Sequence, residues 1–115
     1  MLRQRNRLRR SSDLRQVRQH GRSWRHPLAI LLVHANGENV SRFSFLASRR
    51  VGKAVDRNRA RRLMREAIRL HLAEIQPGWD CLLIARHNTP KAAYPDIETA
   101  VMQLLRRANL LEADS

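Results

Sequence analysis

The stretch RRVGKAVDRNRARRLMREAIRLHLAEI, Arg49–Ile75, combines a helical repeat of apolar residues with a dense run of positive charge. Its apolar positions lie mostly three or four residues apart, which is typical of a helix that packs one face against a core. They are Ala60, Leu63, Met64, Ala67, Ile68, His71 and Ile75. Pro77 and Gly78 follow and predict the end of the helix. The stretch therefore predicts a long amphipathic helix.

The polar side of this helix is strongly basic. Residues 49–66 hold seven arginines and one lysine against two acids, Asp56 and Glu66. At about 100° per residue, the side opposite the apolar face and its flanks carry Asn58, Arg59, Arg61, Arg62, Arg65 and Arg69. A charged helix face is usually only solvated, but such a face normally alternates acids with bases. The shortage of acids here favours contact with a polyanion over plain solvation.

The start of the helix adds two expectations. Gly52 lets the backbone turn before the helix, although an ordinary loop glycine is an equally valid interpretation. The triplet Arg57–Asn58–Arg59 is predicted at the helix N-terminus, where free N–H groups also favour phosphate. Ala54 and Val55, just before it, are expected to pack.

Composition points to the same kind of partner. The chain has 115 residues, 43% of them hydrophobic, which suits one domain with one modest core. Its formal charge of +13 makes nucleic acid the first candidate partner and an acidic membrane surface the weaker one. No apolar run approaches the roughly 20 residues of a spanning helix, and no secretory signal is visible. A cytoplasmic, membrane-free protein is expected.

The N-terminal half is predicted to contain an arm, a helix and a hairpin. Residues 1–10 are basic with little periodicity, so a flexible or weakly helical arm is expected. Ser11 or Ser12 can cap a helix that Gly21 ends, with Leu14 and Val17 on its buried side. Strands are predicted at 28–33 and 42–48. The Asn36–Gly37 pair between them predicts an antiparallel hairpin.

The C-terminal half supplies one strand and one helix. The apolar run at 80–85 is typical of an interior strand. A last helix is predicted from near Pro95, with an apolar stripe of Ile97, Ala100, Val101, Leu104, Leu105 and Ala108. The order helix, strand, strand, helix, strand, helix predicts a single α+β domain with helices against a sheet.

Catalytic and metal-binding patterns are not visible in the sequence. The ten acids are scattered, and the five histidines show no ligand spacing. His71 is expected to be a packed core histidine, and Cys81, in an apolar strand, a buried small hydrophobe in a reducing compartment. The sequence therefore indicates a protein that binds a polyanion and shows no visible catalytic group or metal site of its own.

The segment RFSFLASRRVGKAVDRNRARRLMREAIR, residues 42–69, closely resembles the signature of the bacterial ribonuclease P protein family. A strand ends in Ser and two basic residues, and a Gly-containing loop, Ala-Val and the Arg-Asn-Arg triplet follow. The resemblance extends to RNRLRRSSDLRQVRQHGRS at 5–23, GWDCLLIAR at 78–86 and LLRRANLL at 104–111. It therefore spans the chain almost from end to end.

The resemblance implies a fold and a function. The fold is an α/β sandwich of three helices on a four-stranded mixed sheet, with a left-handed crossover around the Arg-Asn-Arg helix and a short fourth strand near the hairpin. The function is removal of the 5′ leader of precursor tRNA by a ribonucleoprotein. Its RNA subunit performs the hydrolysis with Mg²⁺ held mainly by RNA, and the protein contacts that RNA and the leader. Composition alone would also suit a small ribosomal protein; a DNA-binding regulator is disfavoured because no helix-turn-helix spacing is visible.

Two groups of residues carry these roles by resemblance. The RNA subunit is expected to contact Arg49, Arg50, Lys53, Arg57, Asn58, Arg59, Arg61, Arg62, Arg65 and Arg69. The leader cleft is assigned to Leu14, Arg18, Phe43 and Phe45. Family members usually carry aromatic rings where Leu14 and Arg18 stand, so charge is expected to replace stacking there. Leu14 packed in the core with Arg18 solvated stays an open alternative, as does a core or cleft position for each phenylalanine.

Overall fold

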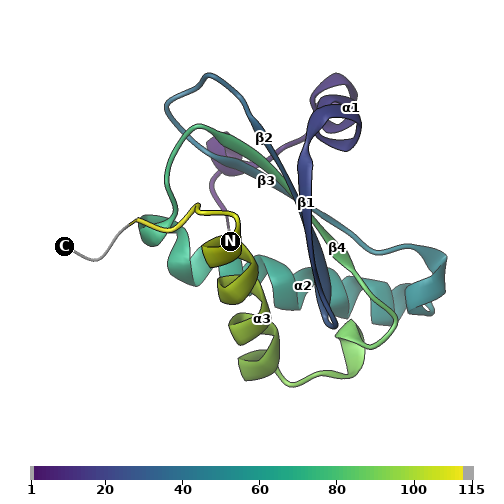
Figure 1. The fold of residues 1–115 in the computed structure, drawn as a ribbon. Helices are drawn as coiled ribbons and strands as arrows, with labels where there is room; N and C mark the ends of the chain where they lie inside the picture. The colour runs from purple at the N-terminus through teal and green to yellow at the C-terminus, as the bar shows by residue number, and fades with distance from the viewer. Residues whose placement is uncertain (1, 113–115) are drawn as a thin grey trace.

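The computed structural model describes residues 2–112 as three helices and one four-stranded sheet (Figure 1). The helices are α1 (Ser11–His20), α2 (Ala54–His71) and α3 (Tyr94–Arg107). The strands are β1 (Arg22–His26), β2 (Ala29–Ala35), β3 (Arg42–Leu46) and β4 (Trp79–Ala85). The α+β class, the three helices and the four strands agree with the prediction.

The sheet has the order β1-β2-β4-β3, and this order corrects the predicted hairpin. β2 does not pair with β3; it lies between β1 and β4 and is antiparallel to both. The hairpin is instead β1–β2, closed by a turn at Pro27 and Leu28 in which the Leu28 N–H donates to His26 Nδ1 at 3.0 Å. β1 is thus the fourth strand. Apolar periodicity did not show it, but the family resemblance implied a short strand near the hairpin.

β4 holds the sheet together because it is an interior strand between β2 and β3. Its residues are almost all buried, as its continuous apolar sequence predicted. It is parallel to β3, so α2 forms the crossover connection between them. The left-handed sense of this crossover stays a prediction.

The two faces of the sheet carry separate apolar clusters. On one face α2 and α3 cover Leu31, Phe43, Cys81 and Leu83 in the main core. On the other, α1 places the fully buried Val17 against Leu82. Figure 1 shows α2 and α3 together on one side and α1 apart from them. α1 covers its face only in part, because four apolar side chains around it stay half-buried: Leu14, Leu32, Leu46 and Ile84.

The N-terminal arm is not flexible or helical as predicted, apart from a short 3-10 turn at Gln4–Asn6. Leu2 and Leu8 are both 3% exposed. The Leu8 N–H donates to the Phe43 carbonyl at 2.8 Å, and Asn6 Nδ2 donates to the Ser41 carbonyl at 2.9 Å. The arm therefore runs along the outer edge of β3, where an edge strand would otherwise leave backbone groups unpaired.

Two predicted helix boundaries also change, and a third is confirmed. α1 starts at Ser11 with Arg10 at its cap, and no side chain accepts a capping hydrogen bond there. Gly21 does end α1, because a Cβ would lie 2.3 Å from the Val17 carbonyl oxygen. α2 ends at His71 rather than near Pro77, but Ile75 remains buried after a short 3-10 turn.

Candidate nucleic-acid interface

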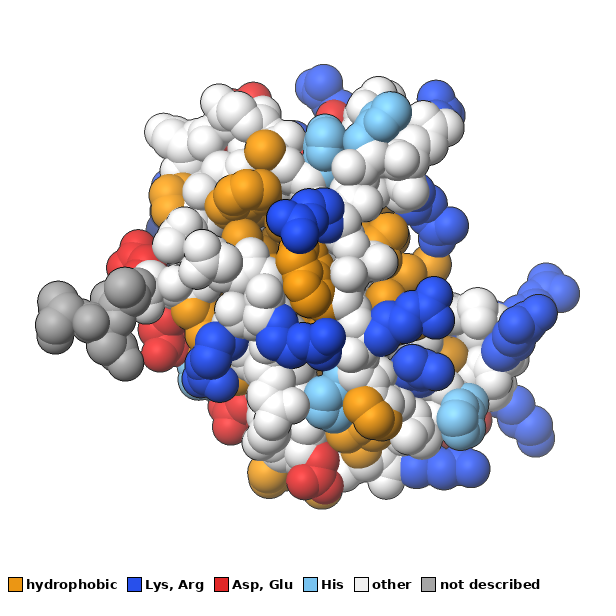
Figure 2. Space-filling model, viewed as in Figure 1, with side chains coloured by type: hydrophobic (Ala, Val, Ile, Leu, Met, Phe, Trp, Pro, Cys, Tyr) orange, Lys and Arg blue, Asp and Glu red, His pale blue; other side chains and the backbone are white. Residues whose placement is uncertain are grey.

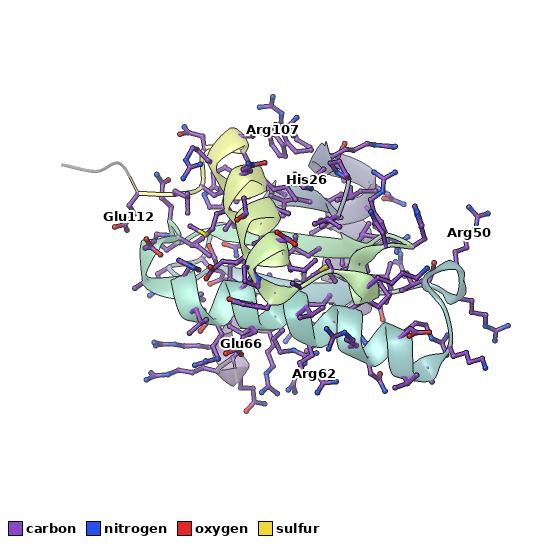
Figure 3. The ribbon with its side chains drawn as sticks, turned by 90° about the horizontal axis from the view of Figure 1, so that it is seen from below. His26, Arg50, Arg62, Glu66, Arg107 and Glu112 are labelled. Atoms are coloured by element: carbon purple, nitrogen blue, oxygen red, sulfur yellow. The ribbon has the colours of Figure 1, made fainter. Side chains whose placement is uncertain are left out.

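The basic side of α2 faces solvent, opposite the buried Ala60, Met64 and Ala67. Asn58, Arg59, Arg62 and Arg69 are exposed, and Arg57, Arg61 and Arg65 are half-buried along its flanks. In Figure 3, Arg62 and Glu66 point away from the rest of the fold, and Arg50 extends from the turn before the helix. The residues expected to contact RNA thus form one continuous surface from Arg49 to Arg69, named here the α2 basic surface.

The start of α2 differs from the prediction in the position of the Arg-Asn-Arg triplet. The helix begins at Ala54, so Arg57 lies one turn inside it and its N–H already donates to the Lys53 carbonyl. The Lys53 N–H donates to Asp56 Oδ2 at 3.3 Å. An acid in the first turn also suits the helix dipole. The triplet therefore offers its side chains, and not free helix-end N–H groups, to a partner.

Gly52 permits this arrangement because its φ is +142°, a value that side chains rarely adopt. A Cβ on Gly52 would lie 2.6 Å from Asp56 Oδ2. The expectation that Ala54 and Val55 pack is wrong: both are exposed, Val55 by 71%. They lie on the outer side of the first turn, where neither the sheet nor α3 reaches them.

The arginines of this surface are not equivalent. Arg59 Nε donates to the Pro90 carbonyl at 2.8 Å. Arg69 forms a two-pronged ion pair with Glu66, which lowers the pKa of Glu66 and raises that of Arg69. Arg62 is exposed at the centre of the surface with no hydrogen bond or ion pair among the described residues. Arg62 is therefore available to a phosphate, whereas Arg59 and Arg69 already have partners within the protein.

A pocket of about 360 Å³ lies beside α2, between the N-terminal arm and β3. The Arg65 guanidinium carbon stands 5.5 Å from the centre of the half-buried Phe45 ring. The remaining lining comes from Leu2, Arg7, Leu8, Arg9, Phe43 and Ser44. Sequence reasoning missed Arg7 and Arg9, because residues 1–10 lack periodicity; the apolar residues at positions 2 and 8 were the available signal.

The four residues assigned to the leader cleft do not come together. Phe43 and Phe45 point to the α2 side of the sheet, and Phe43 is only 2% exposed, within the core. Leu14 packs on the opposite side, and Arg18 is exposed on α1. Alternate residues of a strand point to opposite faces, so the sheet itself separates the phenylalanines from α1. Phe43 is excluded as a stacking platform.

α1 is positioned over its face by an ionic network. Arg42 donates to both carboxylate oxygens of the buried Asp80, at 2.8 and 2.7 Å, and lies 3.4 Å from Asp13 of α1. The hydrogen bond with Asp80 raises the pKa of Arg42. Asn36 Nδ2 adds a bond to Asp80 at 2.9 Å. This network holds α1 beside the half-buried apolar residues of its face.

His71 is not the packed core histidine that was expected. It contacts the carboxylates of Glu74 and, at 2.8 Å, Glu98 of α3, and its side chain is 24% exposed. Hydrogen bonds to the two acids, Glu98 first, raise the pKa of His71. The contact with Glu98 joins α2 to α3. Cys81 is buried as expected, and burial raises the pKa of its thiol.

Electrostatics across the described residues favour an anionic partner. Figure 2 shows Lys and Arg side chains over the middle and right of one face, with most of the visible acids along its left and lower margins. Within residues 2–112, no group of three or more His, Cys, Asp or Glu side chains is placed to hold a metal ion. Over the same range no helix is long and apolar enough to cross a membrane.

Known proteins match this chain over most of its length. The family model described as Ribonuclease P matches residues 2–109. The ribonuclease P protein component of Alkaliphilus oremlandii is 37% identical over 94% of this chain and 95% of its own. That of Herpetosiphon aurantiacus is 43% identical over 90% and 85%.

Solved structures share the fold. The RNase P protein of Thermotoga maritima superposes with a TM-score of 0.80 at 27% identity, over 93% of this chain and 98% of its own. A Staphylococcus aureus RNase P protein gives a TM-score of 0.84 at 22% identity, over 93% and 98%. The match over most of the chain and the similarity to these relatives are consistent with the basic helix. The chain therefore belongs to the ribonuclease P protein family.

Proposed function

We propose that this protein binds the RNA subunit of ribonuclease P through the α2 basic surface. As a member of this family it is the protein component of an endoribonuclease holoenzyme. The observation that carries the proposal is the continuous surface from Arg49 to Arg69, in which Arg62 has no acidic partner among the described residues. Arginine binds RNA phosphates through a planar fork of N–H donors. A surface of positive charge also raises the rate at which RNA associates with the protein.

In this proposal, hydrolysis belongs to the RNA subunit, and RNA holds most of the Mg²⁺. The described carboxylates are largely engaged within the protein. Asp13 and Asp80 contact Arg42, Glu66 contacts Arg69, and Glu74 and Glu98 contact His71. RNA phosphates supply the hard oxygen ligands that Mg²⁺ prefers. The part left to the protein is to position RNA and to offset its charge.

The 5′ leader of precursor tRNA is proposed to run over the face of the sheet that α1 half covers. Arg18 is exposed on α1, and the half-buried Leu14, Leu32, Leu46 and Ile84 offer apolar contact nearby. This places the leader opposite the α2 basic surface, so one protein can bind the RNA subunit and the substrate at once. Phe45, on the α2 side, is reassigned to the RNA subunit.

The test is cleavage of labelled precursor tRNA in Mg²⁺ by the protein, by the RNA subunit, and by both. We expect the complex to cleave fastest, giving a leader with a 3′-hydroxyl and tRNA with a 5′-phosphate, and the protein alone to be inactive. Cleavage by rigorously RNA-free protein would contradict the proposal. Sequencing of co-purified RNA is a second test: one dominant structured RNA is expected, and ribosomal RNA would favour a ribosomal protein. We also propose a cytoplasmic location and no DNA partner.

A further inference from the structure

We propose that the pocket between the N-terminal arm and α2 binds one unpaired nucleotide of the RNA subunit, with its base stacked at Arg65 and Phe45. The inference rests on the proposed function and specifies one contact within it. The pocket, about 360 Å³, is lined by residues of the arm, β3 and α2. No residue of its lining is acidic.

The two planar groups of the pocket suit a base. Arg65 stands over the Phe45 ring at 5.5 Å, and both side chains are half-buried. Neither side chain contacts an acid among the described residues, so the guanidinium charge is available to a ligand. Unpaired RNA bases stack on aromatic rings and on guanidinium planes, whereas paired bases have no free face. The stack therefore selects a single-stranded nucleotide.

The arm supplies the phosphate-binding side. Arg7 is half-buried, and its Nε donates to the Leu2 carbonyl at 3.0 Å, which orients the guanidinium within the wall of the pocket. Arg9 is exposed at the rim. Because Leu2 and Leu8 are buried, the backbone that carries both arginines is fixed before any ligand binds, and the bond to Leu2 also fixes the Arg7 side chain. Preorganised donors lose less conformational freedom on binding.

A single-stranded nucleotide fits these groups better than an acidic peptide does. A peptide carboxylate could pair with the arginines but has no flat face to stack at Arg65 and Phe45. The apolar part of the lining, Leu2, Leu8 and Phe43, also suits the edge of a base. One pocket that combines three cations with an aromatic ring matches a nucleotide, which carries both an anion and a ring.

The main test is the affinity of the whole protein for the RNA subunit across a range of salt. Arg65→Lys keeps the charge and removes the planar group, so we expect affinity to fall about 5- to 150-fold, the equivalent of one lost base stack. The salt dependence should stay unchanged. Arg106→Lys is the matched comparison, because Arg106 lies in the last turn of α3, outside the pocket and the α2 basic surface, and it should change affinity less than about twofold.

The arm is tested by Arg9→Gln, with Arg106→Gln in the last turn of α3 as its control. Arg9→Gln should flatten the slope of log K against log salt by about 0.7, one single-strand phosphate contact; the control should not. Wild-type affinity for Arg65→Lys, with Arg106→Lys equally silent, would overturn the inference while leaving the proposed function intact. Failure of the wild-type protein to bind the RNA subunit would instead refute the proposed function.

Nuclear magnetic resonance separates the classes of ligand. An adenylate hexamer should shift the Arg65 side-chain N–H and Phe45 ring signals of the full chain, and inorganic phosphate at equal ionic strength should not. Equal shifts with both would mean an anion site only. Shifts with a hexaglutamate peptide and not with the hexamer would mean a protein partner. Either result would overturn the inference.

Discussion

The α2 basic surface predicts opposite effects for two neighbouring charges on the affinity for the RNA subunit. Arg62 is exposed and has no ionic partner among the described residues, whereas Arg69 is held by Glu66. Arg62→Gln should therefore remove a phosphate contact. Glu66→Gln should release Arg69 and create one. The depressed pKa of Glu66 keeps its carboxylate charged at neutral pH, so the substitution does remove a charge.

The size of each effect follows from counterion release. One phosphate contact changes the slope of log K against log salt by about 0.7 on a single strand and about 0.9 on a duplex. Over a tenfold change of salt this corresponds to about 5- to 8-fold in affinity. Arg62→Gln should lower the slope by this amount, and Glu66→Gln should raise it. Neutralising Arg62, Arg65 and Arg69 together should remove about two contacts, not three, because Glu66 already neutralises Arg69.

Filter binding of the labelled RNA subunit between low and high salt measures these slopes. Circular dichroism provides the control for folding, and we expect no change, because the three arginines lie away from the buried side of α2. A gain of affinity in Glu66→Gln is the informative result, since damage to the fold cannot produce it. Slopes that stay at the wild-type value in both single variants, with the fold intact, would refute the assignment of α2 to RNA.

Three further predictions concern stability and one concerns the leader. Gly52→Ala should destabilise the fold by about 1–3 kcal/mol, the cost of a strained residue, because φ is +142° and a Cβ would meet Asp56; chemical denaturation of the two proteins measures it. Asp80→Asn should cost about 3 kcal/mol in the same assay, the lower end for breaking a buried ion pair, because Arg42 is 24% exposed and can reach water. His71, whose pKa is raised, should stabilise the fold fully below about pH 6.5 and lose that contribution as pH rises through its folded pKa. The melting temperatures of wild type and His71→Gln should therefore converge at high pH, and a difference that stays constant with pH would contradict this. Arg18→Ala should weaken the binding of precursor tRNA to the holoenzyme more than that of mature tRNA, most strongly at low salt, and Arg18→Phe should restore the affinity with a shallower salt dependence. Equal effects on the two tRNAs would show that Arg18 does not contact the leader.

The helices were predictable because each carries its own periodic signal. Ala60, Met64 and Ile68 of α2 are four residues apart, and all three are buried as predicted. Strand pairing was not predictable in the same way. The Asn36–Gly37 pair is a strong local turn signal. β2 instead pairs with β4, which lies more than forty residues away in the chain, and buries more apolar surface by doing so. A local signal cannot report the competition between a near partner and a distant one.

Site residues divide along the same line. Basic side chains on the polar side of an amphipathic helix have only solvent to face, so the periodicity of α2 was enough to place Asn58, Arg62 and Arg69 at the surface. For a strand, a period of two shows that Phe43 and Phe45 share a face but not which face. Which face they occupy depends on where α2 packs. The predicted cleft, which also included Leu14 and Arg18, therefore combined residues from opposite faces of the sheet.

The arm shows how buried leucines can be concealed among charges. Its arginines hide the two leucines that anchor it, because residues 3–7 between them are all polar and no repeating apolar pattern is visible. Pairing of Leu8 with Phe43 gives the outer edge of β3 a partner and brings Arg7 and Arg9 beside Arg65. Three cations from two distant segments then line one pocket that holds an aromatic ring and no acid. Such an arrangement is costly to hold in isolation, because like charges repel, and it becomes favourable when a polyanion binds. The positive charge of α2 therefore continues onto the arm, as the proposed nucleotide pocket requires.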